Sequence, residues 1–379
     1  MRPPMTWSAL PVRSIDRPDP ATRAAAIARQ ETWAIASGAR FDALEVRVDA
    51  TGNSTTHARR AIAVGEPIVT IPRRLIITDV ELAATSTGEP DPYGGRGRSP
   101  RDTLATWLAL EACRADSPWR PFLDVLPVQL PDLPMFRGDG DLDALAGTAA
   151  HVLAAEVHAD VLATHGAFAD EMRARVPLAD YAWGRAIVGS RGFNAPDTIE
   201  QRIALIPIVD LMDHHPGETT WTYDLERAEY VVSALRAFDA GQAVHFDYGT
   251  YGNGHLLVEY GFALPDNPHD EALLMFGETP VIVSARFDER LMNALTLARP
   301  PAWEPGALDE LAAAALRSVE RLARGAPREP GSSSWDEICA VVRRGERKVL
   351  DEIVAFTAGA SSQLLRDYRD WAAAAIADV

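Results

Sequence analysis

ALIPIVDLMDHHPGETTWTYDLERAEYVVSALRAFDAGQAVHFDYGTYGNGHLLVEYGF, residues 204–262, is the stretch that decides the fold. Its apolar start, Ile203 to Val209, runs into the polar residues 213–217, a pattern that predicts a short buried strand ending in a turn. Further along, 230–235 and 244–248 are predicted to pair as a hairpin joined around 238–241. Tyr248 would then face the interior at a strand end, beside Gly249.

Length, composition and charge exclude several classes of function. The chain has 379 residues, 47% of them hydrophobic, which is enough for two or three domains with substantial cores. Its 37 basic and 54 acidic residues give 37 − 54 = −17, so we expect no nucleic acid or membrane ligand and favour basic partners. Residues 1–20 hold no apolar segment of signal-peptide or membrane-span length.

The two cysteines, Cys113 and Cys339, lie far apart without Cys/His spacing around them. Neither a disulfide framework nor a zinc cluster is therefore predicted, and a reducing cytoplasm fits best.

The remaining chain alternates between strand and helix patterns. Residues 21–37 predict a helix ended by Gly38, 41–48 and 67–77 predict strands, and 85–101 is a Gly/Pro/Ser-rich linker or mobile loop. Ser99 and Pro100 predict a helix start, after which helices dominate to about residue 188. Amphipathic segments near 286–298, 308–324, 335–357 and 361–376, including Leu316 on the apolar face, predict a separate C-terminal helical domain.

Candidate chemistry gathers around Tyr248. A phenol, a histidine and clustered carboxylates suit acid/base catalysis, metal binding or a polar ligand pocket, and composition alone does not choose between them. No metal site is predicted, because the Asp and His spacing around Asp210 and His214 lacks a diagnostic pattern. His151, His158 and His165 recur every seven residues, which places them two helical turns apart and favours core histidines over ligands.

Several motifs resemble, in order, a known family. SRGF (190–193), ALIPIVDLMDHH (204–215) and AGQAVHFDYGTYGNGHLLVEYGFALPDNPHD (240–270) resemble the SET domain of the branch that contains the Rubisco large-subunit lysine methyltransferases and the actin-histidine methyltransferase. The similarity covers most of residues 36–280. It implies an α+β fold: an N-terminal extension (1–35), a β-rich SET-like domain (36–280) with a helical insertion at about 99–188, and an all-α domain resembling the branch's substrate-binding domain (281–379).

The resemblance also implies a function. It is S-adenosylmethionine-dependent methyl transfer to a side-chain nitrogen of a protein or peptide, with lysine as the expected residue and histidine as the alternative. Tyr248 would be the central catalytic tyrosine. The residues that would bind the cofactor are Arg191, Asp210, Asp213, His214, Asn53, Ser54 and Thr55, and those lining the substrate pocket are Tyr251, Tyr260 and Phe262.

The sequence departs from the family pattern at three places. Thr51-Gly52-Asn53-Ser54-Thr55 stands where the family has a Gly-x-Gly loop, Asp213 replaces an asparagine, and Gly252 replaces a serine. These departures motivate a second hypothesis, a divergent SET-fold protein that no longer transfers methyl groups and binds or transforms a small metabolite. A third is a structural or peptide-docking protein in which Tyr248 and His214 are core residues.

Overall fold

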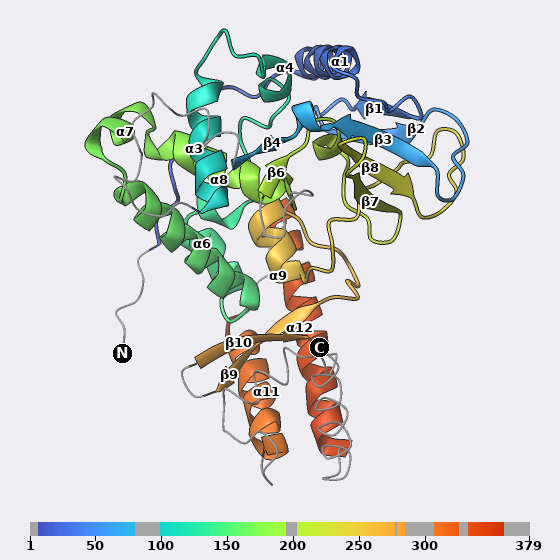
Figure 1. Cartoon of the computed structure of the whole chain (residues 1–379). Coiled ribbons are helices and arrows are strands. Elements are labelled where there is room, and N and C mark those ends of the chain that lie inside the picture. Colours follow the sequence, from blue (N-terminus) through green and yellow to red (C-terminus); the bar gives the residue numbers. More distant parts are fainter. Residues whose placement is uncertain are drawn as a thin grey trace. The chain divides into compact units, whose positions relative to one another are not determined.

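The computed structural model describes residues 7–79, 99–194, 203–276, 279–284, 307–325 and 333–359 (Figure 1). The chain divides into two compact units. One, here the strand-rich unit, holds residues 10–130 and 159–250; the other, the C-terminal unit, holds 1–9, 131–158 and 251–379. The predicted helices 286–298 and 361–376, and most of the loop 85–101, lie outside the described residues. The predicted domain boundaries at 35/36 and 280/281 stay predictions.

The strand-rich unit begins with the predicted helix and then a hairpin, of which the sequence predicted the first strand but not the second. Helix α1 (Pro20–Ala36) is capped by Asp19, whose carboxylate accepts from the backbone N–H groups of residues 21 and 22. Gly38 follows with φ of +83°, a left-handed conformation that glycine adopts at low cost. Strands β1 (Leu44–Val48) and β2 (Ser54–Ala58) then pair antiparallel.

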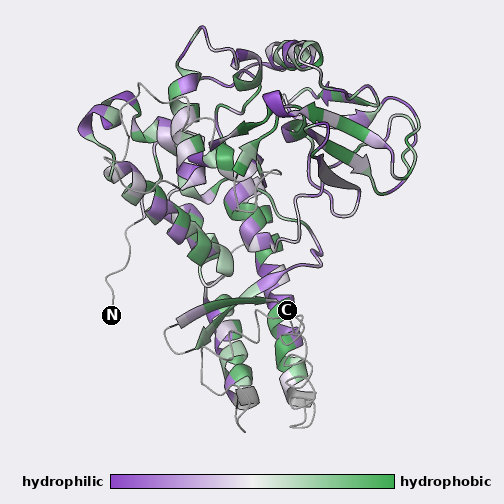
Figure 2. Cartoon of the chain, viewed as in Figure 1, coloured by the Kyte–Doolittle hydropathy of each residue, from purple (hydrophilic) through white to green (hydrophobic). Residues whose placement is uncertain are grey.

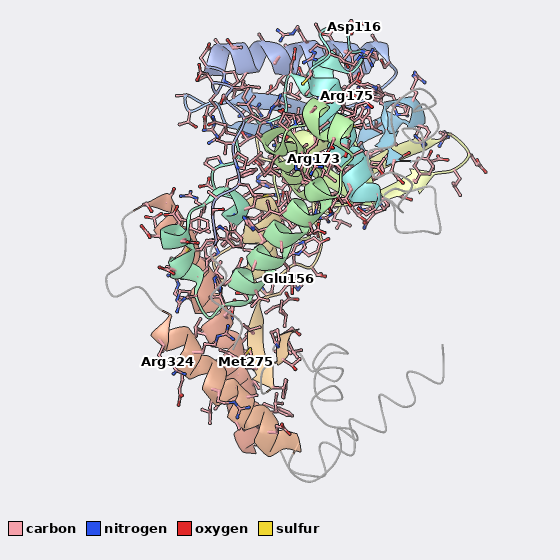
Figure 3. The ribbon with its side chains drawn as sticks, turned by 90° about the vertical axis from the view of Figure 1, so that its left-hand side faces the viewer. Asp116, Glu156, Arg173, Arg175, Met275 and Arg324 are labelled. Carbon is pink, nitrogen blue, oxygen red and sulfur yellow. The ribbon has the colours of Figure 1, made fainter. Side chains whose placement is uncertain are left out.

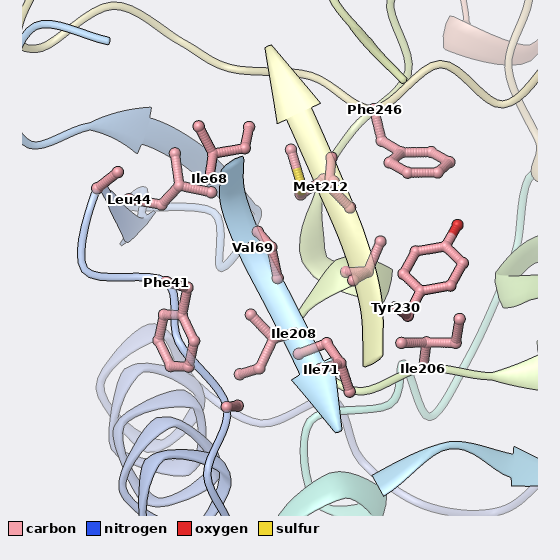
Figure 4. Close-up of a cluster of buried hydrophobic side chains, with 14 of the residues drawn as sticks. Phe41, Leu44, Ile68, Val69, Ile71, Ile206, Ile208, Met212, Tyr230 and Phe246 are labelled. Carbon is pink, nitrogen blue, oxygen red and sulfur yellow. The ribbon is translucent and has the colours of Figure 1, made fainter. Parts of the chain in front are cut away.

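Two small sheets surround one apolar core in this unit. The first is ordered β3-β8-β7 and the second β4-β6-β5, with bounds β3 (Pro67–Pro72), β4 (Ile77–Thr78), β5 (Gly192–Asn194), β6 (Ile203–Leu205), β7 (Thr219–Asp224) and β8 (Glu229–Ala234). Short helical turns η1 (Arg73–Leu75) and η4 (Val209–Leu211) lie between strands. Figure 4 shows the core around β3, which includes Val69, Ile71, Ile206, Met212, Tyr230 and Phe246.

The predicted hairpin between 230–235 and 244–248 is wrong. Strand β8 pairs with β7 on one side and β3 on the other. Residues 238–244 instead run beside β2 and the residues after it, where Val244 donates to the Thr56 carbonyl and Phe238 exchanges backbone bonds with Ile62. The alternation was read correctly, since Val244 and Phe246 are buried, but it does not specify which strand is the partner.

Helices form the remainder of the strand-rich unit: α3 (Pro100–Ala112), α4 (Arg120–Leu123), α7 (Asp170–Arg175) and α8 (Leu178–Arg191), with α6 (Ala149–Gly166) entering it from residue 159. The predicted Ser99 cap is confirmed, because its hydroxyl accepts from the Asp102 amide at 3.1 Å. Figure 3 shows Arg173 and Arg175 on α7. Both lie in its last turn, where cations offset the negative end of the helix dipole.

The C-terminal unit combines short helices, one hairpin and two long helices. Its elements are η2 (Pro134–Phe136), α5 (Asp139–Leu142), η3 (Asp143–Leu145), α9 (Asn253–His255), the π-helical turn η5 (Leu256–Tyr260), β9 (Glu271–Phe276), β10 (Thr279–Ser284), α11 (Ala307–Arg324) and α12 (Ser334–Gly359). Figure 2 shows β9 and β10 as predominantly hydrophobic strands. One hydrophobic core of the C-terminal unit includes Leu274, Leu311, Leu322 and Ile353.

Two predicted features of the C-terminal helices are corrected. Leu316 is 51% exposed rather than on the buried face of α11, because the apolar face follows Leu311, Ala314, Ala315 and Leu322. Residues 281–284, expected in an all-helical region, belong to β10. Among the described helices, none combines the length and hydrophobicity that a membrane span requires.

Close packing of α3 against α8 predicts a sensitive position. A Cβ at Gly184 would lie 2.3 Å from the Ala105 carbonyl oxygen. We expect Gly184→Ala to lower the free energy of unfolding by about 1–3 kcal/mol, because the helices must separate. Urea denaturation measures this, with Gly166→Ala as control, where nothing lies within 4 Å of the added Cβ. Equal stability of the two variants would contradict this packing.

Candidate active site

The candidate site is organised by a sharp turn in front of η4. Ile208, a buried β-branched residue, has φ of +75°. This conformation is strained for such a residue, and strain of this kind clusters at functional sites. It redirects the chain so that Val209–Leu211 and then residues 212–214 face the segment 246–248.

One short bridge joins these two segments. His214 and Phe246 pair as a parallel β-bridge. The Phe246 amide donates to the Asp213 carbonyl at 2.8 Å, and the His215 amide donates to the Phe246 carbonyl at 3.2 Å. Predicted site residues that lie more than thirty positions apart in the sequence are therefore adjacent in space.

Tyr248 is fixed at both ends by the first segment. Its backbone N–H donates to His214 Nδ1 at 3.1 Å, and its hydroxyl donates to the Met212 carbonyl at 2.9 Å. The Tyr248 and His214 rings lie 4.9 Å apart between centroids. Burial raises the pKa of Tyr248, with Arg191 opposing and the carboxylates of Asp213 and Asp210 adding to the rise. The phenol is therefore a neutral hydrogen-bond donor at physiological pH.

His214 has a definite tautomer in this arrangement. Its Nδ1 lies 3.1 Å from the Tyr248 amide and 3.3 Å from the Phe246 carbonyl. A single unprotonated Nδ1 accepts from the amide, whereas only a protonated one donates to the carbonyl. Burial lowers the pKa of His214, which favours the neutral ring. The contact with the Tyr248 amide is the shorter of the two and gives that N–H its acceptor, so we assign the proton to Nε2 and the Nδ1 lone pair to Tyr248.

Arg191 and Asp210 form the charged part of the site. The Arg191 guanidinium, on the last residue of α8, lies 3.6 Å from the Asp210 carboxylate and also donates to the Asp210 carbonyl. Asp210 is 5% exposed, and neither carboxylate oxygen has a hydrogen-bond partner among the described residues. Burial raises its pKa to about 6, although the Arg191 and Arg23 charges oppose the rise. A buried carboxylate in this state is ready to accept from a bound donor.

Arg23 is a site residue that sequence reasoning missed. Its guanidinium, supplied by α1, donates to the Val125 carbonyl at 2.9 Å and lies 3.4 Å from Ser54 Oγ. Burial and then the neighbouring Arg191 charge lower its pKa. It thereby connects the predicted Ser54 to the charged pair of Arg191 and Asp210. No local motif marks it, since a lone arginine on an amphipathic helix normally faces solvent.

Of the predicted loop Asn53–Thr55, only Ser54 is connected to this charged pair, through Arg23. Gly52, with φ of +85°, and the Asp49 carboxylate, which accepts from the amides of residues 51 and 53, shape the turn between β1 and β2. The side chains of Asn53 and Thr55 are exposed, and Thr55 Oγ1 lies 2.9 Å from His57 Nε2. The glycine that the turn conformation requires is therefore present.

Asp213 lies at the open side of the site. Its side chain is exposed, while partial desolvation by its surroundings raises its pKa against the attraction of His245 and Arg191. An asparagine here would offer a donor and an acceptor, whereas the carboxylate only accepts once it is ionised. The position therefore suits a positively charged ligand group.

The three predicted pocket residues lie in the C-terminal unit and cluster with one another. Tyr251 and Tyr260 have ring centroids 6.3 Å apart, and Tyr260 and Phe262 6.1 Å apart. His255, which the sequence did not single out, stacks on Tyr251 at 4.2 Å. Tyr260 ends the π-helical turn η5, a geometry often found at functional sites.

Histidines elsewhere have structural partners. His158 Nε2 lies 2.8 Å from the Ser8 carbonyl, and His165 Nε2 lies 3.0 Å from the Val176 carbonyl. Within the described ranges, no group of three or more His, Cys, Asp or Glu residues is arranged to hold a metal ion.

Comparison of the sequence with known proteins finds no protein-family model that matches it. The actin-histidine N-methyltransferase of Rhinolophus ferrumequinum is 28% identical over 268 residues, and that of Danio rerio is 27% identical over 267 residues; each match covers 65% of this chain and 43% of the relative. The chain thus spans less than half the length of these curated relatives.

Solved structures decide the fold. The structure of Rubisco LSMT bound to AdoMet superposes with a TM-score of 0.65 at 18% identity, covering 88% of this chain and 91% of that chain. The SET domain of LSMT bound to lysine and AdoHcy superposes with a TM-score of 0.64 over the same shares. The chain has a SET-domain fold. The predicted α+β class is confirmed, and Tyr248, His214 and Arg191 lie together within the strand-rich part of this SET fold.

Buried Asp210 predicts a pH-dependent stability difference. Its folded pKa of about 6 lies above the ordinary value of 3.8. The contribution of the Asp210 carboxyl to the free energy of unfolding is therefore fully present below pH 4 and is lost as pH rises through 6. Relative to the unmodified chain, Asp210→Asn should therefore gain up to about 3 kcal/mol in unfolding free energy between pH 4 and pH 7. Urea denaturation at both pH values measures it. A pH-independent difference would contradict burial of the ionisable carboxyl.

Proposed function

We propose that this SET-fold chain is an S-adenosylmethionine-dependent N-methyltransferase that acts on a lysine side chain of a protein. The observation that carries the proposal is the fixed phenol of Tyr248, held by His214 and Met212 beside the buried Asp210 and its partly exposed ion-pair partner Arg191. The likeness to actin-histidine N-methyltransferases and to AdoMet-bound Rubisco LSMT supports it.

The charged residues fit the cofactor's amino-acid end. Arg191 is partly exposed and its Nε has no hydrogen-bond partner among the described residues, so it suits a carboxylate. The Asp210 carboxylate, which has no hydrogen-bond partner among the described residues, and the exposed Asp213 carboxylate suit an ammonium group. His214, Ser54 and the β1–β2 turn would complete the binding surface. When bound, the cofactor supplies a methyl group on a positively charged sulfur, which is open to attack by a nitrogen lone pair.

The surroundings of Tyr248 suit a neutral amine nucleophile. Phe246 packs against Tyr248 with centroids 6.2 Å apart, and Phe193 packs edge-on against Phe246 at 5.4 Å. An apolar wall of this kind lowers the pKa of an ammonium group, which makes the lone pair available. The Tyr248 hydroxyl donates its proton to the Met212 carbonyl, so its oxygen would orient the nucleophile by accepting from an amine N–H, and its raised pKa keeps the phenol neutral. Lysine fits such an apolar wall better than histidine, since an imidazole needs a polar partner to fix its ring.

Partner and compartment follow from charge and cysteine content. The net charge of −17 favours a basic segment as substrate and disfavours nucleic acid and anionic membrane surfaces. Cys113 and Cys339 are both free thiols, in agreement with a reducing cytoplasm. Tyr251, Tyr260 and Phe262 would contact the substrate side chain.

Cofactor binding provides the first test. Isothermal titration calorimetry with S-adenosylhomocysteine should show binding to the unmodified chain and about 10- to 100-fold weaker binding to Arg191→Ala, because one charge-assisted interaction is lost. Arg227→Ala, which removes a 75% exposed guanidinium from the same unit, is the control. Absence of binding to the unmodified chain would favour the divergent, metabolite-binding hypothesis.

Methyl transfer to protein provides the second test. Tyr248→Phe should lower the rate of methyl incorporation into cell extract about 100-fold, because the nucleophile loses its orientation, while Tyr223→Phe on β7 should retain the rate. Amino-acid analysis of the labelled protein then identifies the modified residue. Methyl-histidine without methyl-lysine would refute the assignment to lysine, and an unchanged rate in Tyr248→Phe would refute the role of the phenol.

A further inference from the structure

The backbone around Tyr248 lies outside regular secondary structure. Residues 247–249 belong to no strand, and isolated bridges at Ala243 and Phe246, rather than a continuous ladder, precede them. A tyrosine whose orientation matters therefore sits on a segment without a continuous ladder of backbone hydrogen bonds. Other groups must fix this segment.

Asp247 supplies two such bonds, one on each side of the site. Its Oδ2 accepts from the Gly217 amide at 2.9 Å, and its Oδ1 accepts from the Gly249 amide at 2.9 Å. Both glycines have positive φ, +76° and +117°, so each amide points where a regular strand would not direct it. One carboxylate therefore joins the chain after His214 to the chain after Tyr248.

Glu218 makes a comparable connection at the other end of the segment. It is buried and accepts from the His245 backbone amide at 3.1 Å and lies 2.8 Å from His245 Nδ1. The Thr219 hydroxyl adds a bond to the His245 carbonyl at 3.0 Å. Residues 245–249 are thus tied to residues 217–219 on both sides of Phe246 and Tyr248.

We propose that Asp247 is a positioning residue for Tyr248: its carboxylate holds the amides of Gly217 and Gly249, and through them the orientation of the phenol relative to His214. The catalytic part of this inference rests on the proposed function, whereas the structural part does not. Asp247 would act through Tyr248 and need not touch the substrate.

The chemistry requires a carboxylate at this position. The two N–H donors bond to different oxygens, Gly217 to Oδ2 and Gly249 to Oδ1, and ionised aspartate provides both acceptors whereas asparagine provides only one. In Asp247→Asn one oxygen remains, and the amide NH₂ faces an N–H group. One of the two glycine amides then loses its partner, so the segment that carries Tyr248 shifts or loosens.

A matched pair of variants tests the catalytic part. In steady-state methyl transfer, Asp247→Asn should lower kcat about 10- to 100-fold, with the KM for S-adenosylmethionine changed less than about threefold, because the phenol is misplaced while the cofactor contacts remain. Asp239→Asn makes the same charge change at an exposed aspartate eight residues earlier and should leave both constants unchanged. An unchanged kcat in Asp247→Asn, or equal losses in both variants, would overturn the proposal.

A second measurement does not depend on activity. The charges that face His214 are Asp247, which raises its pKa, and His215 and His245, which lower it. NMR titration of the His214 ring should therefore show a lower pKa in Asp247→Asn and an unchanged pKa in Asp239→Asn. An unchanged His214 pKa in Asp247→Asn would show that the carboxylate is not near this ring.

Amide hydrogen exchange of the unmodified protein covers the case in which Asp247→Asn does not fold. The Gly217 and Gly249 amides should exchange at least about tenfold more slowly than unstructured glycines, because each is hydrogen-bonded. Exchange at unstructured rates would overturn the proposal. If the unmodified protein neither binds cofactor nor transfers methyl groups, the proposed function fails, while the titration and exchange results still decide whether Asp247 holds the segment.

Discussion

The site depends on the bridge between Asp213-His214-His215 and Phe246. Two backbone hydrogen bonds, from the Phe246 amide to the Asp213 carbonyl and from the His215 amide to the Phe246 carbonyl, connect segments that are distant in sequence. Apolar burial stabilises this bridge, since Met212 and Phe246 both belong to the core of the strand-rich unit. The bridge also sets the register in which the Tyr248 amide meets His214 Nδ1 and its hydroxyl meets the Met212 carbonyl.

Two features close to this bridge are energetically unfavourable for folding. Ile208 adopts a positive φ, and the Asp210 carboxylate is buried with no hydrogen-bond partner among the described residues. Each feature costs free energy of folding. Ile208 and Asp210 are separated only by Val209, and they come just before residues 212–214, which contact Tyr248. A positive φ and a buried carboxylate without a hydrogen-bond partner, so close together in the sequence, are typical of a functional site rather than of ordinary core packing.

Local features were predictable from the sequence, because each depends on neighbouring residues. Helix α1 with Gly38 after it, the Ser99 cap and strand β1 all follow from short-range patterns. Strand pairing was not predictable in the same way. Alternation showed that Val244 and Phe246 face inward, yet the partners of β8 are β7 and β3, and the segment 238–244 lies beside β2 and the residues that follow it.

The candidate site residues that could be predicted from the sequence are those that lie in family-like motifs. Tyr248, His214, Arg191 and Asp210 come together as the family resemblance implied. Arg23 and Asp247 were not predicted to belong to the site, because their roles come from contacts with Ser54, Gly217 and Gly249 that only the folded chain creates. Positioning groups in loops leave no periodic signal, and a sequence pattern therefore marks candidate site residues before it marks the groups that hold them.

Burial drives three ionisable groups of the site, Tyr248, Asp210 and His214, toward their neutral forms. It raises the pKa of Tyr248 and Asp210 and lowers that of His214, so each group is driven toward its neutral form. A lysine side chain entering the same surroundings would experience the same effect and lose its proton more readily than in water. Methyl transfer to nitrogen requires that lone pair. The desolvation that costs the fold stability at Asp210 is therefore the same property that would make a lysine nucleophilic beside Tyr248.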